Sequence, residues 1–140
     1  MSVLVYTENW DGKFKKSSFE LVSYASKVAE MLGSSVTALS IGKVDTAELE
    51  KLGKYGAQKI ISVVNDNLSV LDNQAYTKVI ADVVRKIDAK VIILSFNNTG
   101  KAIAPRLSVN LKAGLAPGVS KLPLSINPFI VYKRAYSGNA

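Results

Sequence analysis

The chain has 140 residues and a formal charge of +7, and its length fits one compact domain. Its 48% hydrophobic and 21% charged residues allow a buried core and exclude a wholly disordered chain. It contains no cysteine and no histidine, so disulfides, thiolate or imidazole metal sites and histidine-based catalysis are excluded. Of the 18 basic residues only Arg85, Arg106 and Arg134 are arginines, a balance that favours plain solubility or an acidic partner over nucleic-acid recognition.

Strand and helix signals alternate along the chain. Residues 3–7 form a short apolar run that is typical of a buried strand, and the polar cluster 9–12 indicates a turn. Ser17 and Glu20 have the spacing of a capping box, which predicts a helix that has Ser17 as its N-cap. Gly33 stands just past the last apolar residue of that helix, where a left-handed cap belongs.

The next segments repeat this alternation. Residues 35–41 and 59–64 predict the second and third strands. The helix between them begins at Asp45 or Thr46, and Gly56 closes it.

A third helix begins at Asp72 or Asn73, and residues 90–96 form the most apolar predicted strand. The loop 97–100 separates that strand from a fourth helix. Along the fourth helix, apolar residues recur every four positions, at Ile103, Leu107 and Leu111.

The pattern changes after residue 113. Residues 113–124 contain Gly and Pro at two points, and residues 129–135 read as an extended segment. We interpret residues 132–140 as an edge strand, or as a cut through a longer protein, with a frayed tail as the plain alternative.

Four successive strand–helix units predict an α/β fold with three α-β-α layers, a mostly parallel sheet and a C-terminal extended or β segment. Ligands of such sheets bind beyond the carboxyl ends of the strands, near the point where the strand order reverses. The candidate ligand loops are therefore residues 8–13, 42–46 and 97–101.

The loop at 97–101 is the best ligand candidate by position. It joins the most apolar strand to a helix N-terminus, whose backbone N–H groups can hold a phosphate. The candidate residues are Asn98, Thr99, Gly100 and Lys101. A plain turn, in which Thr99 caps the helix and Gly100 eases the bend, explains the same residues and is favoured because neither a P-loop nor a GxGxxG pattern is present.

Other residues have a functional and a plain interpretation. Arg106 either holds a carboxylate or phosphate across an interface or is a surface arginine packed on its helix. Pro105 falls within about the first turn of that helix, where a missing N–H costs little. Trp10 is a candidate interface anchor. Glu8 has no visible base, nucleophile or metal ligands beside it, so we predict no catalytic residue and no metal site.

Three stretches form a set whose order and separation are specific. They are VLVYTE at residues 3–8 followed by GKF at 12–14, GKAIAPRLS at 100–108, and YSGNA at 136–140. The set resembles the N-terminal domain of the electron transfer flavoprotein alpha subunit from end to end. Lys101 departs from the usual Arg, and residues 116–119 depart from the family's Ser-Asp.

The resemblance implies one domain over residues 1–140 with an adenine nucleotide alpha hydrolase-like, Rossmann-like fold, truncated before the FAD-binding domain. It implies a heterodimer with a beta subunit, whose single FAD lies mostly in that absent domain. Electrons would pass from dehydrogenases, such as the acyl-CoA dehydrogenases of fatty acid oxidation, to a membrane-linked quinone oxidoreductase. The nucleotide loop would be degenerate, and no FAD is expected in this fragment.

We therefore expect a scaffold that binds partners, not an enzyme. Its expected interface or domain-junction residues are Arg106, Tyr136, Gly138 and Asn139. No signal or transit peptide precedes the first strand and no segment is long enough to span a membrane, so we expect a cytoplasmic bacterial protein.

Three alternatives remain. The first is a stand-alone adenine-nucleotide-binding domain of the universal stress protein type, which usually carries Gly-x-x-Gly where this chain has Gly100 alone. The second is a nucleotide alpha-hydrolase enzyme, and the third is a basic nucleic-acid binder.

Overall fold

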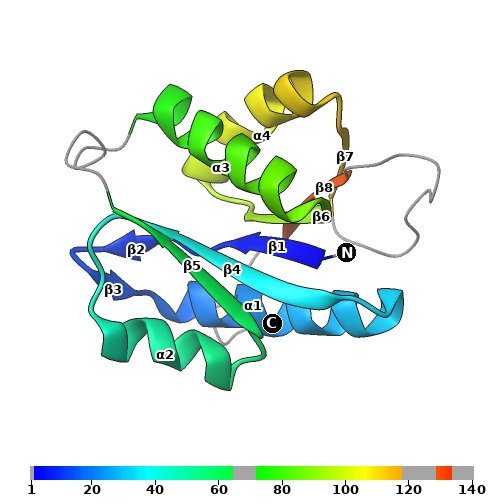
Figure 1. Cartoon of the computed structure of the whole chain (residues 1–140). Coiled ribbons are helices and arrows are strands. Elements are labelled where there is room, and N and C mark those ends of the chain that lie inside the picture. The colour runs from blue at the N-terminus through cyan, green and yellow to red at the C-terminus, as the bar shows by residue number, and fades with distance from the viewer. Residues whose placement is uncertain (1, 65–71, 118–128, 134–140) are drawn as a thin grey trace.

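A six-stranded parallel sheet forms the middle layer of the computed structural model, which describes residues 2–64, 72–117 and 129–133 (Figure 1). The strand order is β5-β4-β1-β6-β8-β7. The strands are β1 (Ser2–Tyr6), β4 (Ser35–Ile41), β5 (Lys59–Val63), β6 (Ala89–Ser95), β7 (Gly114–Pro117) and β8 (Phe129–Lys133). A separate antiparallel hairpin consists of β2 (Asn9–Trp10) and β3 (Lys13–Phe14).

Helices cover both faces of the sheet (Figure 1). Helices α1 (Lys16–Leu32) and α2 (Thr46–Lys54) pack on one face, and α3 (Asn73–Ile87) and α4 (Asn98–Leu111) pack on the other. The predicted three-layer α-β-α fold with a parallel sheet is therefore confirmed.

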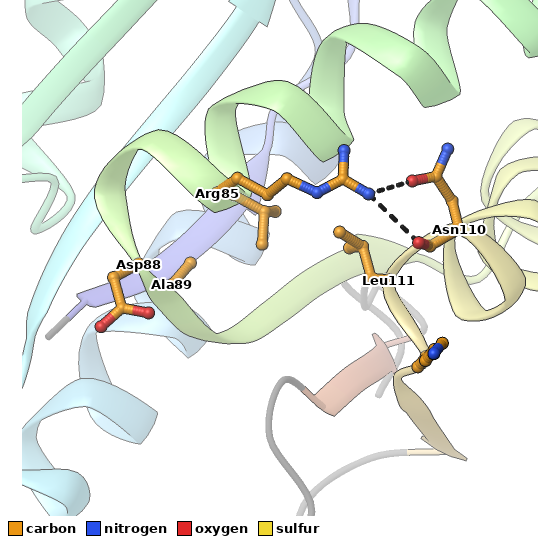
Figure 2. A pocket seen from close by; sticks show the side chains of 7 residues that line it. Arg85, Asp88, Ala89, Asn110 and Leu111 are labelled. Atoms are coloured by element: carbon orange, nitrogen blue, oxygen red, sulfur yellow. Dashed lines mark hydrogen bonds between the residues drawn. The ribbon is translucent and has the colours of Figure 1, made fainter.

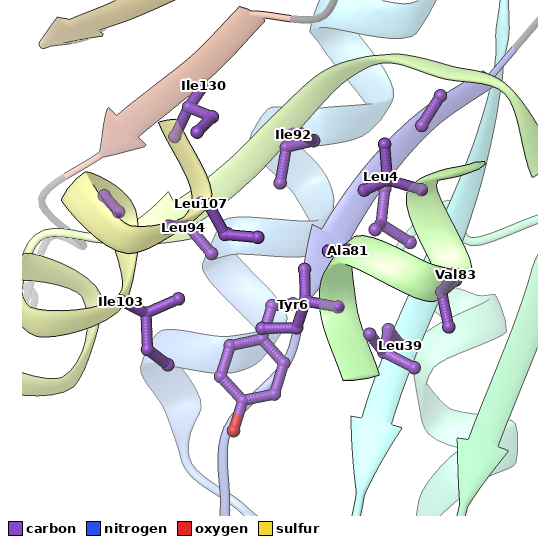
Figure 3. Close-up of a cluster of buried hydrophobic side chains, with 14 of the residues drawn as sticks. Leu4, Tyr6, Leu39, Ala81, Val83, Ile92, Leu94, Ile103, Leu107 and Ile130 are labelled. Atoms are coloured by element: carbon purple, nitrogen blue, oxygen red, sulfur yellow. The ribbon is translucent and has the colours of Figure 1, made fainter. Parts of the chain in front are cut away.

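The central strand β1 is buried along its whole length and divides the core into two clusters. Its Val3 and Val5 pack toward α1, whereas Leu4 and Tyr6 pack toward α3 and α4 (Figure 3). Successive side chains of a strand point to opposite faces, so a continuous apolar run is what a strand covered on both sides requires.

The ends of the predicted helices are only partly right. Asp72 caps α3 as predicted, because its side chain accepts hydrogen bonds from the backbone N–H groups of Gln74 and Ala75. Gly33 closes α1 in the left-handed conformation, as predicted. Ser17, however, is not an N-cap: it lies inside the first turn of α1, after an N-cap residue that makes no side-chain cap bond.

Pro105 lies deeper in α4 than its position in the sequence suggested. The helix begins at Asn98, so Pro105 stands about two turns inside it, and the prediction of a first-turn position is wrong. A proline has no N–H, so Pro105 cannot donate to the carbonyl of Lys101 one turn earlier.

The C-terminal extended segment is not an edge strand. Strand β8 lies between β6 and β7 and pairs in parallel with both, so the edge-strand interpretation of residues 132–140 is wrong for Tyr132 and Lys133, and residues 134–140 lie outside the described residues. Within the described residues, the edge strand on this side of the sheet is β7, which sequence reasoning missed because a Gly at its start and a Pro at its end are typical of turns.

Candidate functional site

The carboxyl ends of β1 and β6 form the topological switch point of the sheet. The chain passes from β1 to β4 and β5 on one side and then returns to β6 on the other side of β1. Glu8 follows β1 and Asn97 follows β6, and the two side chains meet: Asn97 Nδ2 donates to Glu8 Oε1 at 2.9 Å and to Glu8 Oε2 at 3.1 Å. We call these two residues the switch-point pair.

Asn97 also caps α4. Its Oδ1 accepts the backbone N–H of Gly100 at 2.8 Å, so one amide group links the helix N-terminus to the Glu8 carboxylate. The cap is thus Asn97, and the prediction of Thr99 as the cap is wrong: Thr99 lies inside the first turn.

Position 100 has no room for a side chain, and this is why it holds a glycine. A Cβ atom built on it would lie 1.8 Å from the carbonyl oxygen of Ser95 at the end of β6. Only a glycine allows α4 to approach the strand so closely, because the obstructing atom belongs to the backbone. The expectation that Gly100 merely eases a bend is therefore wrong.

The ammonium group of Lys101 lies over the ring of Phe96. Its Nζ lies 4.5 Å from the centroid of the Phe96 ring, and that ring packs edge-on against Tyr132 at 5.6 Å. Lys101 is exposed, so this cation–π contact lies at the surface.

The switch point does not suit a nucleotide phosphate. The Gly100 N–H, one of the groups that could hold an anion, is already bound to Asn97. The Glu8 carboxylate stands beside the same helix end, where its negative charge would repel a phosphate. The occupied N–H of Gly100 and the Glu8 carboxylate thus disfavour the phosphates of FAD or AMP at this helix end.

Tyr6 is the last residue of β1 and is buried. Burial raises the pKa of its phenol well above the ordinary value, and the nearby Glu8 charge and Tyr76 raise it further. The two rings pack edge-on at 6.5 Å. Tyr6 therefore contributes its ring to the core under α3 and α4.

The structure brings the three predicted loops together at the edge of the sheet that the carboxyl ends of the strands form. Asn9 Nδ2 donates to the Ile41 carbonyl oxygen at 2.8 Å, which joins the loop after β1 to the end of β4. Ser18 Oγ donates to the Glu8 carbonyl oxygen at 2.6 Å and fixes the start of α1 to the same loop.

Arg106 lies away from this edge, on the exposed side of α4. Its Nη1 donates to the Ala102 carbonyl oxygen of its own helix at 2.7 Å, and Ile103 and Leu107 fill the buried side. The other predicted junction residues, Tyr136, Gly138 and Asn139, lie outside the described residues.

A pocket of about 340 Å³ lies at the opposite edge of the sheet, near the amino end of β6, where α3 and α4 end (Figure 2). Arg85 Nη2 donates to the carbonyl oxygen of Asn110 at 3.1 Å and to its Oδ1 at 2.5 Å. A helix C-terminus carries partial negative charge, so Arg85 clamps the end of α4 to α3. Sequence reasoning missed this contact because nothing in the spacing of Arg85 and Asn110 indicates it.

Among the described residues, no helix is long and apolar enough to cross a membrane.

Sequence comparison identifies a family. The profile described as "Electron transfer flavoprotein domain" matches residues 3–140. An acryloyl-CoA reductase electron transfer subunit beta of Anaerotignum propionicum is 30% identical over 128 residues, which cover 91% of this chain and 35% of the relative. An electron transfer flavoprotein subunit alpha of Megasphaera elsdenii is 31% identical, covering 86% and 36%. The subunit alpha of Clostridium acetobutylicum is 27% identical, covering 98% and 41%.

The chain thus spans between about a third and two fifths of the length of these curated relatives. Solved structures share its fold. A universal stress protein from Archaeoglobus fulgidus has a TM-score of 0.58 at 15% identity, covering 94% of this chain and 97% of its own. Another, in complex with cAMP, has a TM-score of 0.57 at 12% identity, covering 96% and 98%. At such identities the likeness shows the adenine nucleotide alpha hydrolase-like fold alone.

Proposed function

Because the chain belongs to the electron transfer flavoprotein domain family, we propose that it is the N-terminal domain of an alpha subunit and serves as a scaffold that pairs with a beta subunit. The observation that carries the proposal is the family match over residues 3–140. Several relatives carry the name electron transfer flavoprotein subunit alpha, which supports the choice of subunit.

In this proposal the domain holds the assembly in place while another domain carries the FAD. Electrons then pass from a dehydrogenase through the bound flavin to a quinone oxidoreductase. Relatives named as an electron transfer subunit of acryloyl-CoA reductase and as subunit LctC of a lactate dehydrogenase support a role beside dehydrogenases and reductases.

The geometry of the switch point supports a scaffold role. The Glu8 carboxylate and the occupied N–H of Gly100 disfavour a phosphate at the N-terminus of α4. The chain shares its fold with universal stress proteins, but this helix end does not favour a nucleotide. Calorimetric titration with AMP or ATP tests the alternative of a stand-alone nucleotide-binding domain. Micromolar binding would favour that alternative, whereas the scaffold proposal expects no heat of binding at such concentrations.

Co-purification with the candidate beta subunit tests the pairing. We expect a 1:1 complex by size exclusion, without flavin absorbance, when this chain is expressed with that subunit. Failure to form a complex would count against the pairing, provided that circular dichroism shows a folded chain.

Arg106 is the proposed interface residue that the structure describes, and its exposed position on α4 makes it available to a partner. In the full-length alpha subunit, Arg106→Ala is expected to weaken assembly with the beta subunit or retention of FAD. Lys86→Ala on α3 is the matched control, because it also removes an exposed helical cation. Equal assembly and flavin content of both variants and the wild type would remove Arg106 from the interface.

A further inference from the structure

The hairpin β2–β3 presents an aromatic and basic outer face. Trp10 and Lys13 are directly opposite each other in the antiparallel register, so their side chains share one face. Asn9 and Phe14 form the other cross-strand pair and face the body of the protein. Trp10 is 74% exposed, although it is the only tryptophan of the chain.

The exposure of Trp10 is imposed by the tethers of the hairpin. The hydrogen bond from Asn9 to the Ile41 carbonyl fixes which face of β2 points inward, and alternation along a strand then turns Trp10 outward. On β3, the Phe14 N–H donates to Glu48 Oε1 at 3.2 Å. The buried Phe14 ring also packs edge-on against Phe19 at 6.0 Å.

Exposed lysines lie on and beside the hairpin. Lys15 Nζ lies 5.6 Å from the centroid of the Trp10 ring, and the backbone of Lys43 lies against Gly12 in the hairpin turn. We call Trp10, Lys13, Lys15, Lys16 and Lys43 the hairpin surface, and all five residues are exposed. The exposed carboxylates nearest to these residues in sequence are Asp11 in the turn and Asp45 before α2, which leave the hairpin surface with an excess of positive charge.

We propose that the hairpin surface is a docking site for an acidic segment of a partner protein. The tethered hairpin holds the tryptophan in place before binding, so little conformational entropy is lost when a partner covers the ring. The lysines on and beside the hairpin attract carboxylates, and tryptophan is an enriched anchor of protein interfaces. The hairpin surface has no arginine and one aromatic ring, a composition that favours an acidic protein over the stacked and bidentate contacts of a nucleic acid. The inference does not depend on the proposed function.

Tryptophan fluorescence of the full 140-residue chain tests the proposal directly, because the emission comes from Trp10 alone. The probe is a short peptide that alternates glutamate with leucine, and its control alternates glutamine with leucine. The glutamate peptide is expected to shift the emission to the blue and to protect the ring from acrylamide, and both effects should fade with salt. The glutamine peptide is expected to do neither.

Two double variants separate the hairpin surface from the overall charge. Lys13→Glu with Lys15→Glu changes the hairpin surface, and Lys78→Glu with Lys86→Glu changes α3 on the other side of the sheet. Each lowers the net charge from +7 to +3, since each substitution contributes −2. The hairpin variant is expected to bind the glutamate peptide about tenfold more weakly, and the α3 variant within about twofold of wild type.

Several results would overturn the proposal. They are absence of binding, an equal loss in both double variants, a stronger emission change with a mixed-sequence DNA oligonucleotide, or an emission change on concentrating the protein alone. Trp10→Ala, read by anisotropy of a fluorescein-labelled glutamate peptide, must also weaken binding while circular dichroism stays unchanged. Unchanged affinity of that variant would exclude Trp10 as the anchor.

Discussion

At the scale of single residues, the switch point is built by two small features: an asparagine that bonds in two directions and a glycine without room for a side chain. Asn97 donates to Glu8 and accepts from Gly100, and the missing Cβ of Gly100 lets α4 begin against the end of β6. The sequence pointed to the loop but not to these contacts, because Glu8 and Asn97 are 89 positions apart.

Gly100→Ala is expected to destabilise the protein by about 3 kcal/mol, because its Cβ would overlap the Ser95 carbonyl oxygen and force the backbone to move. Gly53→Ala in α2 is the matched control. Nothing lies within 4 Å of a Cβ at Gly53, so this change is expected to stabilise by about 0.5 kcal/mol through helix propensity. Urea denaturation measures both, and equal effects of the two substitutions would contradict the steric role of Gly100.

Asn97→Asp is expected to lower the free energy of unfolding by about 1 kcal/mol at neutral pH. The introduced carboxylate can still accept the Gly100 N–H, but it meets the Glu8 carboxylate as a like charge. Adding Glu8→Gln should restore stability, because the glutamine amide can donate to the introduced carboxylate in place of the original donor. Urea denaturation of the four proteins gives the coupling, and purely additive effects would show that the pair does not interact.

At the scale of elements, periodicity predicted the strands and helices of the four strand–helix units with bounds close to those observed. It did not predict the hairpin β2–β3, although its turn residues Asp11 and Gly12 both have the positive φ that a two-residue hairpin turn requires. The Asp-Gly pair is the sequence signal for such a hairpin, and the interpretation of residues 9–12 as a plain turn misses it. The hairpin is held from outside by Glu48, a contact between elements that no local pattern encodes.

The tether from Glu48 is expected to depend on pH. The hydrogen bond from Lys51, and then that from the Phe14 N–H, hold the pKa of Glu48 below its ordinary value. A lowered pKa in the folded state means that the tether stabilises the hairpin above the ordinary glutamate pKa of about 4.3 and is lost as pH falls through the lowered value. The protection factor of the Phe14 amide in hydrogen exchange, which removes the intrinsic pH dependence of exchange, should therefore fall on acidification.

Glu48→Gln should remove this pH dependence, because a glutamine does not titrate. Glu50→Gln, an exposed neighbour on the same helix, should leave it unchanged. An identical pH profile for wild type and Glu48→Gln would show that another group controls the hairpin.

At the scale of the whole molecule, the sheet separates the buried hydrophobic residues that the structure describes into two clusters, one on each face. Ile92 packs in the cluster under α3 and α4, whereas the next residue, Ile93, packs in the cluster under α1. The alternation of strands and helices made this layered arrangement predictable from sequence. The insertion of β8 between β6 and β7 was not predictable, because strand order beyond the repeating units depends on tertiary pairing.

Conservative truncations test the separation of the two cores. Ile92→Val and Ile93→Val are each expected to cost about 1 kcal/mol, and together they should be additive within about 0.5 kcal/mol despite being adjacent. Ile92→Val with Ile130→Val is the contrasting pair, because these residues are register partners on one face and should couple. Urea denaturation measures both cycles, and strong coupling between Ile92 and Ile93 would contradict two separate cores.

The interior position of β8 also dictates an order of events during synthesis on the ribosome. Within the described residues, β7 pairs with β8 alone, so it has no strand to join when it leaves the exit tunnel. The side of β6 that later receives β8 remains open over the same interval. The pairing of β6 with β8 and of β8 with β7 therefore forms in one late step, after residues 129–133 have been synthesised. Until then the nascent chain exposes the unpaired edge of β6, which a chaperone or another chain can bind.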